Sequence, residues 1–259
     1  MCVVTNVMKQ MAGYRGAGIG ILWLYVFAGC DLTGQYDANF QKALQTSAQR
    51  AVFDLNLHQT FTEVLDPERK NVGVKLRIPK FFDNNSKSIL VADLKGPAGL
   101  AIPGLSYAIE RQLDDQNGQW LPAYVYFAAI PKADMKADAL QAALVQVAAT
   151  LVPGAAWSDV QVATPDGKPL ALKRLQASGP QPFMDQQKKA AAKVDGRFDL
   201  YYVDGGNHHV LIAWRAPKGQ GEKYQFDAAT QAAMGTVEVT EPPSAPAKGG
   251  AAAPKGGCA

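Results

Sequence analysis

The pattern of apolar and polar positions predicts one well-defined helix in the middle of the chain. Between residues 133 and 151, apolar side chains recur at intervals of three and four residues, the spacing that places them on one helical face. This apolar stripe consists of Leu140, Leu144, Val147 and Leu151. Asp134 stands where an N-cap residue is expected, and the pair Pro153 and Gly154 ends the pattern.

Alternation of apolar and polar residues predicts β-strands on both sides of this helix. In residues 121–130 both alternating sets are largely apolar, so we expect this strand to lie in the centre of a sheet. The clearest hairpin is residues 196–217, with its turn at 204–207. Further strands are predicted at 53–58, 72–79, 88–94, 106–113, 157–164 and 169–177, and further helices at 183–193 and 225–234.

Strands grouped before and after one long helix, and joined by hairpin turns, favour the α+β class. We therefore predict an antiparallel sheet of about six to eight strands backed by helices, in a single globular domain at residues 51–239. A tether at 30–50 precedes this domain. Residues 240–259 are rich in Pro, Ala, Gly and Lys and contain no large apolar residue, which predicts a disordered tail.

Residues 1–29 have the features of a secretory signal peptide. Arg15 is followed by an apolar run from Ala17 to Gly29, which is too short for the roughly 20 residues of a membrane-spanning helix. Cys30 comes directly after Ala28 and Gly29, and this arrangement resembles the lipobox of bacterial lipoproteins. The resemblance implies cleavage between Gly29 and Cys30, acylation of Cys30 by chains such as palmitate, and a location in the bacterial cell envelope, facing the periplasm or the exterior. An ordinary secretory signal or an uncleaved anchor is the alternative.

The overall composition is that of an ordinary globular protein. Hydrophobic residues make up 47% of the chain and the formal net charge is +3, with the lysines scattered along the sequence. We therefore expect no nucleic-acid partner. Cys2 and Cys30 lie in and directly after the leader, which leaves Cys258 without an intramolecular partner and predicts no disulfide framework. The expected partners are the lipid bilayer, through acylated Cys30, and another envelope protein; no cofactor or metal is predicted.

Three segments are similar to the PsbP-like family, named for an extrinsic subunit of photosystem II. They are the strand end Leu-Arg-Ile-Pro-Lys-Phe-Phe at 76–82, the hairpin at 198–214, and the end of the last helix at 234–237. The resemblance covers about half of the chain that follows the leader. It implies an α+β domain that acts as an adaptor or accessory subunit, in a family without shared catalytic residues.

The residues with most chemical potential are the histidines and one arginine. His208 and His209 are adjacent in a predicted strand, so they face opposite sides and are badly placed to bind one metal ion together. Arg215 ends the same strand and offers a fork for a carboxylate or phosphate, or else forms a structural ion pair. Tyr201 is a further candidate for partner contact. An alternative hypothesis groups His58, His208 and Arg215 into a small-ligand or hydrolase site.

The leading hypothesis is therefore a lipid-anchored envelope protein whose domain is a non-enzymatic binding or accessory module. It depends on the lipobox together with the lack of a recognisable catalytic motif in the sequence. No residue is predicted to be catalytic, and the question of enzymatic activity stays open at this point.

Overall fold

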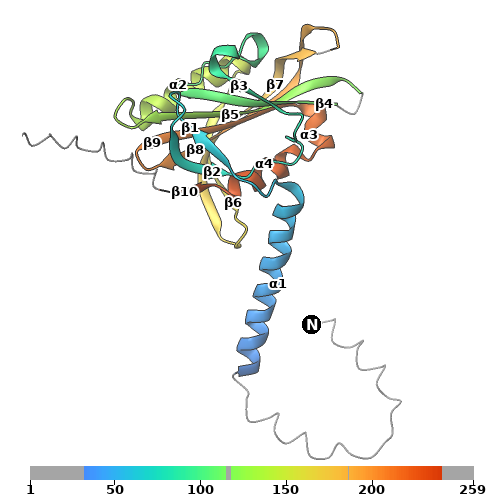
Figure 1. Ribbon diagram of the computed structural model, residues 1–259, viewed down its shortest axis with the longest axis vertical. Helices are drawn as coiled ribbons and strands as arrows, with labels where there is room; N and C mark the ends of the chain where they lie inside the picture. Colours follow the sequence, from blue (N-terminus) through green and yellow to red (C-terminus); the bar gives the residue numbers. More distant parts are fainter. Residues whose placement is uncertain (1–31, 115–117, 186, 241–259) are drawn as a thin grey trace, which may run out of the picture. The chain divides into compact units, whose positions relative to one another are not determined.

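Seven antiparallel strands form the main sheet, in the order β3-β4-β5-β9-β8-β7-β6. The computed structural model describes residues 32–114, 118–185 and 187–240. Figure 1 shows the sheet with helices and a smaller sheet packed against it. The seven strands are β3 (Lys87–Leu90), β4 (Leu105–Asp114), β5 (Trp120–Pro131), β6 (Ala156–Ala163), β7 (Pro169–Asp185), β8 (Ala190–Gly205) and β9 (His208–Pro217).

A second, three-stranded antiparallel sheet has the order β1-β2-β10. Its strands are β1 (Thr62–Leu65), β2 (Asn71–Leu76) and β10 (Glu238–Val239). The helices are α1 (Leu32–Asn56), α2 (Ala137–Leu151), α3 (Lys218–Lys223) and α4 (Phe226–Gly235), with short 3-10 helices η2 (Val91–Asp93) and η3 (Gly96–Ala98). The predicted α+β class, with an antiparallel sheet backed by helices, is confirmed.

Both faces of the central strands of the main sheet are buried, because other elements cover them. One face packs against the small sheet, the last turns of α1, and α4 through Phe226 and Met234. The other face packs against α2 and the segment between β3 and β4, through Leu140 and Leu144. Strand β5 contributes alternate residues to both cores, which confirms its predicted central position. The two cores are called the α4 face and the α2 face below.

Two predicted elements are wrong in type. Of the residues predicted as a strand at 53–58, positions 53–56 form the end of α1, and Leu57 follows it as an isolated bridge to Pro79. Phe53 and Leu57, four residues apart, are buried, whereas Leu55 is 74% exposed. The apolar residues at these positions fit both the alternation of a strand and the i, i+4 spacing of a helix. Tertiary packing selects the helix. Residues predicted as a helix at 183–193 instead extend the β7–β8 hairpin, with Phe183 opposite Ala192.

Two predicted boundaries and the predicted buried face of one helix also change. Helix α2 begins at Ala137 and not near Asp134, because its N-cap is Lys136 and no side chain caps it. Its buried row is completed by Ala148, whereas Val147 is only partly buried. Strand β3 is shorter than the prediction at 88–94 and continues as the 3-10 helix η2.

Contacts divide the chain into two units, residues 1–47 and 48–259, which we describe separately. In the first unit, residues 32–47 are helical, and Tyr36 stacks on Phe40 one turn later, with ring centroids 6.4 Å apart. All other contacts described below lie within the second unit. Within the described ranges, no helix has the length and apolarity needed to cross a membrane.

Candidate functional site: a groove beside the β7–β8 hairpin

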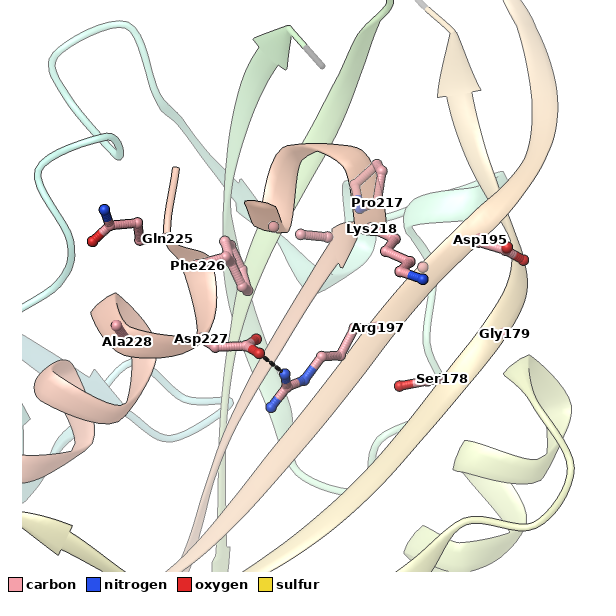
Figure 2. A pocket seen from close by; sticks show the side chains of 13 residues that line it. Ser178, Gly179, Asp195, Arg197, Pro217, Lys218, Gln225, Phe226, Asp227 and Ala228 are labelled. Atoms are coloured by element: carbon pink, nitrogen blue, oxygen red, sulfur yellow. Dashed lines mark ion pairs between the residues drawn. The ribbon is translucent and has the colours of Figure 1, made fainter. Parts of the chain in front are cut away.

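A cavity of about 730 Å³ lies on the α4 face, where the long β7–β8 hairpin passes the end of β9 and the α3–α4 corner. Figure 2 shows this groove from close by. Strands supply its floor and the two short helices supply its wall. The lining residues are Ser178, Gly179, Asp195, Gly196, Arg197, Ala216, Pro217, Lys218, Gly221, Gln225, Phe226, Asp227 and Ala228.

Two glycines, Gly179 and Gly196, lie opposite one another in the β7–β8 register at the floor of the groove. A Cβ on Gly196 would lie 2.7 Å from the ring of Phe183, and a Cβ on Gly179 would lie 3.0 Å from Val152. Gly179 also has a φ of +154°, which side-chain-bearing residues rarely adopt. These two positions therefore require glycine for packing on the α2 face, the side of the sheet opposite the groove.

Arg197 organises the charges in the groove. Its guanidinium forms ion pairs with Asp199, two residues along β8, and with Asp227 in the first turn of α4. Figure 2 shows Arg197 and Asp227 pointing toward one another across the groove. The second contact to Asp199, from Nη2 to Oδ1, is 3.3 Å long. This network ties the start of α4 to the sheet and fixes one side of the groove.

Burial has opposite effects on the partners of this network. Asp199 is fully buried, and this burial raises the pKa of its carboxyl, although Arg197 and Arg174 act to lower it. Burial also acts to lower the pKa of Arg197, but its two carboxylate partners outweigh this effect and raise it overall. Arg197 is thus a fixed cation whose charge is matched by aspartates of the protein itself.

The rim carries two exposed side chains of opposite charge, Lys218 and Asp195. Neither forms an ion pair within the part of the chain that the structure describes. Beneath the wall, Phe226 is buried and packs on Phe81 with ring centroids 5.5 Å apart. The groove therefore combines an apolar floor with a charge-balanced rim.

The corner between α3 and α4 is under backbone strain. Gln225, the N-cap residue of α4, has φ +48° and ψ 43°, which is the left-handed region. Residues other than glycine rarely adopt this conformation, and such residues cluster at functional sites. Gln225 is exposed and lines the groove, so the strain lies at the candidate site itself.

The sequence hypothesis that grouped His58, His208 and Arg215 does not match their placement. His208 and Arg215 are seven residues apart on β9, about 23 Å at the usual rise of a strand, and they face opposite sides. The Nε2 atom of His58 lies 2.8 Å from the carbonyl oxygen of Phe82, on the α4 face. The three residues therefore do not share one site.

Arg215 is fully buried on the α2 face and has no carboxylate partner within the described residues, so the expected structural ion pair is not formed. Instead, its guanidinium donates to the side-chain oxygen of Gln181 at 3.1 Å and to the carbonyl oxygens of Pro97 and Pro182. It also stacks over the ring of Phe183 at 4.5 Å. Arg215 is thus a structural cross-link between η3 and the end of β7.

His209 and Tyr201 are also too buried to contact a protein partner directly. His209 Nε2 lies 2.9 Å from the Met135 carbonyl oxygen, and its Nδ1 lies 2.8 Å from the hydroxyl of Tyr202. Since a carbonyl oxygen only accepts, Nε2 carries a proton and donates in this contact. Tyr201 is fully buried on the α4 face. The candidate lipidation residue Cys30 and the cleavage residue Gly29 lie outside the described residues.

The groove residues were missed by sequence reasoning because their strands were not predicted in full. Because the strand predicted at 169–177 ends too early and a helix is predicted at 183–193, the alternation from Asp195 to Asp199 has no partner strand in the prediction. The usable signal was Arg197-x-Asp199, a spacing that places opposite charges on one face of a strand.

No group of three or more His, Cys, Asp or Glu residues suited to hold a metal ion occurs among the residues that the structure describes. Comparisons with known proteins found no matching family model, no matching curated protein and no matching solved structure. The similarity to the PsbP-like family therefore stays a prediction.

Proposed function

We propose that this chain is a lipid-anchored protein of the bacterial cell envelope whose α+β domain is a non-enzymatic binding module for another envelope protein. In this proposal the groove receives an apolar segment of the partner. The observation that carries it is the combination of a largely apolar groove with a rim that presents Lys218 and Asp195. Such a rim suits a polypeptide, whose charged groups have both signs, better than a ligand of one charge.

The size of the cavity supports the same proposal. A volume of about 730 Å³ lies within the range of pockets that enclose a ligand, and it is larger than one side chain needs. The internal pairing of Arg197 with Asp199 and Asp227 leaves this guanidinium with little attraction for an added anion. The floor can therefore contribute chiefly by burying apolar surface, at about 25 cal/mol per Å².

Site-specific photo-crosslinking in the native membrane tests the binding part. A photoreactive amino acid replaces Ser178, which is exposed and lines the groove, and as a control it replaces exposed Ala142 on α2. We expect one defined protein adduct from position 178 only. Gly221 lines the groove and a Cβ there would enter open space, so Gly221→Phe places a ring at the groove and Gly221→Ala adds only a methyl group.

The expected result is loss of the adduct in Gly221→Phe and its retention in Gly221→Ala. Equal adducts from positions 178 and 142, or an adduct that survives Gly221→Phe, would overturn the groove as the binding site. Anchoring is tested independently by the intact mass of the membrane-fraction protein, wild type beside Cys30→Ser. A mature N-terminus at acylated Cys30, lost in the variant, is expected; an unmodified and uncleaved chain would refute the anchor.

A further inference from the structure

A second, smaller cavity opens beside α4, closer to the β6 edge of the sheet. Its volume is about 240 Å³, below the range of typical drug-sized pockets, so it suits a small ligand or a single functional group. Strands β6, β7 and β8 and helix α4 all contribute to it. The lining residues are Val160, Gln161, Val162, Arg174, Tyr201 and Gln231.

Two buried polar atoms at this cavity lack hydrogen-bond partners. The hydroxyl of Tyr201 and the Nε atom of Arg174 are both shielded from solvent, and neither makes a hydrogen bond of ordinary geometry among the described residues, although the Arg174 side chain is close enough to act on the Tyr201 hydroxyl. Tyr201 as a whole is fully buried. Because most buried polar groups in proteins are hydrogen-bonded, two adjacent exceptions at one cavity indicate that a partner is supplied from outside the chain.

The charge distribution favours an anion as that partner. Asp199 and Asp227 both form ion pairs with Arg197. No carboxylate of the described residues lies within ion-pair distance of Arg174. Burial and the charge of Asp199 raise the pKa of Tyr201, whereas Arg174 acts to lower it, so the phenol stays protonated near neutral pH. Both orphan groups are consequently hydrogen-bond donors, and one of them is a cation.

We propose that this cavity binds the oxyanion group of a small molecule, a carboxylate or a phosphate. Arg174 donates through its buried Nε–H edge and Tyr201 donates through its hydroxyl. The Gln231 amide of α4 adds a further donor at the cavity wall. The guanidinium edge, with parallel N–H groups, matches the two oxygens of either oxyanion. This site is separate from the groove of the proposed function and does not depend on it.

NMR of arginine side chains in the full-length protein tests this inference. The probes are sodium acetate and sodium phosphate, titrated at constant ionic strength against sodium chloride. We expect the Nε–H resonance of Arg174, assigned by its loss in Arg174→Lys, to shift saturably with at least one probe. Saturation by acetate alone assigns a carboxylate ligand, and saturation by phosphate alone assigns a phosphate ligand.

Three variants separate binding from structure. Tyr201→Phe is expected to lower the affinity for the saturating probe by about tenfold, the usual effect of losing one hydrogen bond to a charged group. Because this change also removes an unpaired buried hydroxyl, it should leave the unfolding midpoint without anion unchanged or higher. Arg174→Gln should abolish the response. Lys173→Gln removes an equal charge from the neighbouring exposed residue and should bind the probe as wild type does.

A shift of the Arg174 resonance that rises linearly and equally with acetate, phosphate and chloride would overturn the proposal. So would saturable probe binding of unchanged affinity in Arg174→Gln. A Tyr201→Phe variant that unfolds at a lower midpoint, without any change in probe affinity, would show that the hydroxyl has a structural partner instead.

Discussion

The α carbon of Gly235, in the last turn of α4, packs directly against the carbonyl oxygen of Ala163 at the end of β6. A Cβ at Gly235 would overlap this oxygen and would also lie 3.3 Å from the ring of Phe53. This contact holds the end of α4 on the sheet, and the two cavities adjoin the same helix. Helix position and cavity shape are therefore linked through one glycine.

Gly235→Ala is expected to destabilise the protein by about 2 kcal/mol, because the backbone of α4 or β6 must shift to admit the methyl group. The matched control is Gly221→Ala in α3, where a Cβ meets open space and alanine has the higher helix propensity. That variant should be unchanged or more stable by up to about 1 kcal/mol. Urea unfolding measures both values, and equal stabilities of the two variants would contradict the close contact.

The parts of the fold that could be predicted from sequence are those with redundant signals. The β8–β9 hairpin has alternation in both strands and a turn sequence between them, and β5 is apolar on both faces. The class α+β follows from these strands and α2. The helix predicted at 183–193 is wrong because its alanines and lysines favour a helix locally, whereas the burial of Phe183 beneath Gly196 keeps the segment in the sheet.

The candidate site was less predictable, because its parts come from segments far apart in the chain. Asp227 faces Arg197 only after α4 has folded back over β8, and no local pattern encodes that meeting. Arg174 and Tyr201 meet only through the register of β7 with β8, which pairs these two residues directly. A sequence pattern gives the face of a residue in its own strand but not its neighbour in the next one.

Arg215 provides a second prediction, on the energetic cost of removing a buried cation that binds only neutral oxygens. Arg215→Met keeps much of the side-chain volume but leaves the carbonyl oxygens of Pro97 and Pro182 without these donors. We expect a loss of about 3 kcal/mol, at one or more kcal/mol for each buried acceptor left unpaired. Hydrogen exchange should increase most in residues 91–104, since Pro97 lies in η3.

Arg215→Lys is the informative comparison for this prediction. Lysine retains the charge, but its single ammonium does not reproduce the planar fork that spans three acceptors and stacks on Phe183. The lysine variant should therefore also be destabilised. Wild-type stability in Arg215→Lys would show that the charge, and not the fork, is what the structure requires.

Asp114 gives a pH-dependent prediction. The Lys223 ammonium and the Tyr224 hydroxyl both donate to it, and they hold the pKa of its carboxyl below the ordinary value of 3.8. A lowered carboxyl pKa contributes stability above the ordinary value, and this contribution is lost as pH falls through the folded-state pKa. Asp114→Asn should thus be less stable than wild type near neutral pH, with a difference that narrows under acid conditions in urea unfolding.

Tyr224 responds at the opposite end of the pH range. Burial, together with the hydrogen bond and charge of Asp114, raises the pKa of Tyr224 to about 12. A raised phenol pKa contributes stability that is fully present below the ordinary value of 10.0 and is lost as pH rises through about 12. Subtracting the phenolate absorbance of Tyr224→Phe from that of wild type isolates the titration of Tyr224. This difference should therefore develop only as the pH approaches about 12. A difference that titrates near the ordinary value would contradict both the burial of the Tyr224 hydroxyl and its contact with Asp114.

The strained N-cap of α4 yields the last prediction. Gln225 has a left-handed backbone that costs a residue with a Cβ about 1 kcal/mol or more, whereas glycine adopts it freely. The Gln225 side chain is exposed, so its removal costs the protein few contacts. Gln225→Gly should therefore raise the free energy of unfolding by about 0.5 kcal/mol, after the greater chain entropy of glycine in the unfolded state is subtracted. Gln225→Ala keeps the Cβ and should leave the free energy of unfolding nearly unchanged. If the strained backbone shapes the groove wall, Gln225→Gly should be more stable than wild type and should give a weaker crosslink from position 178. Higher stability with an unchanged crosslink would show that the strain is not needed for binding.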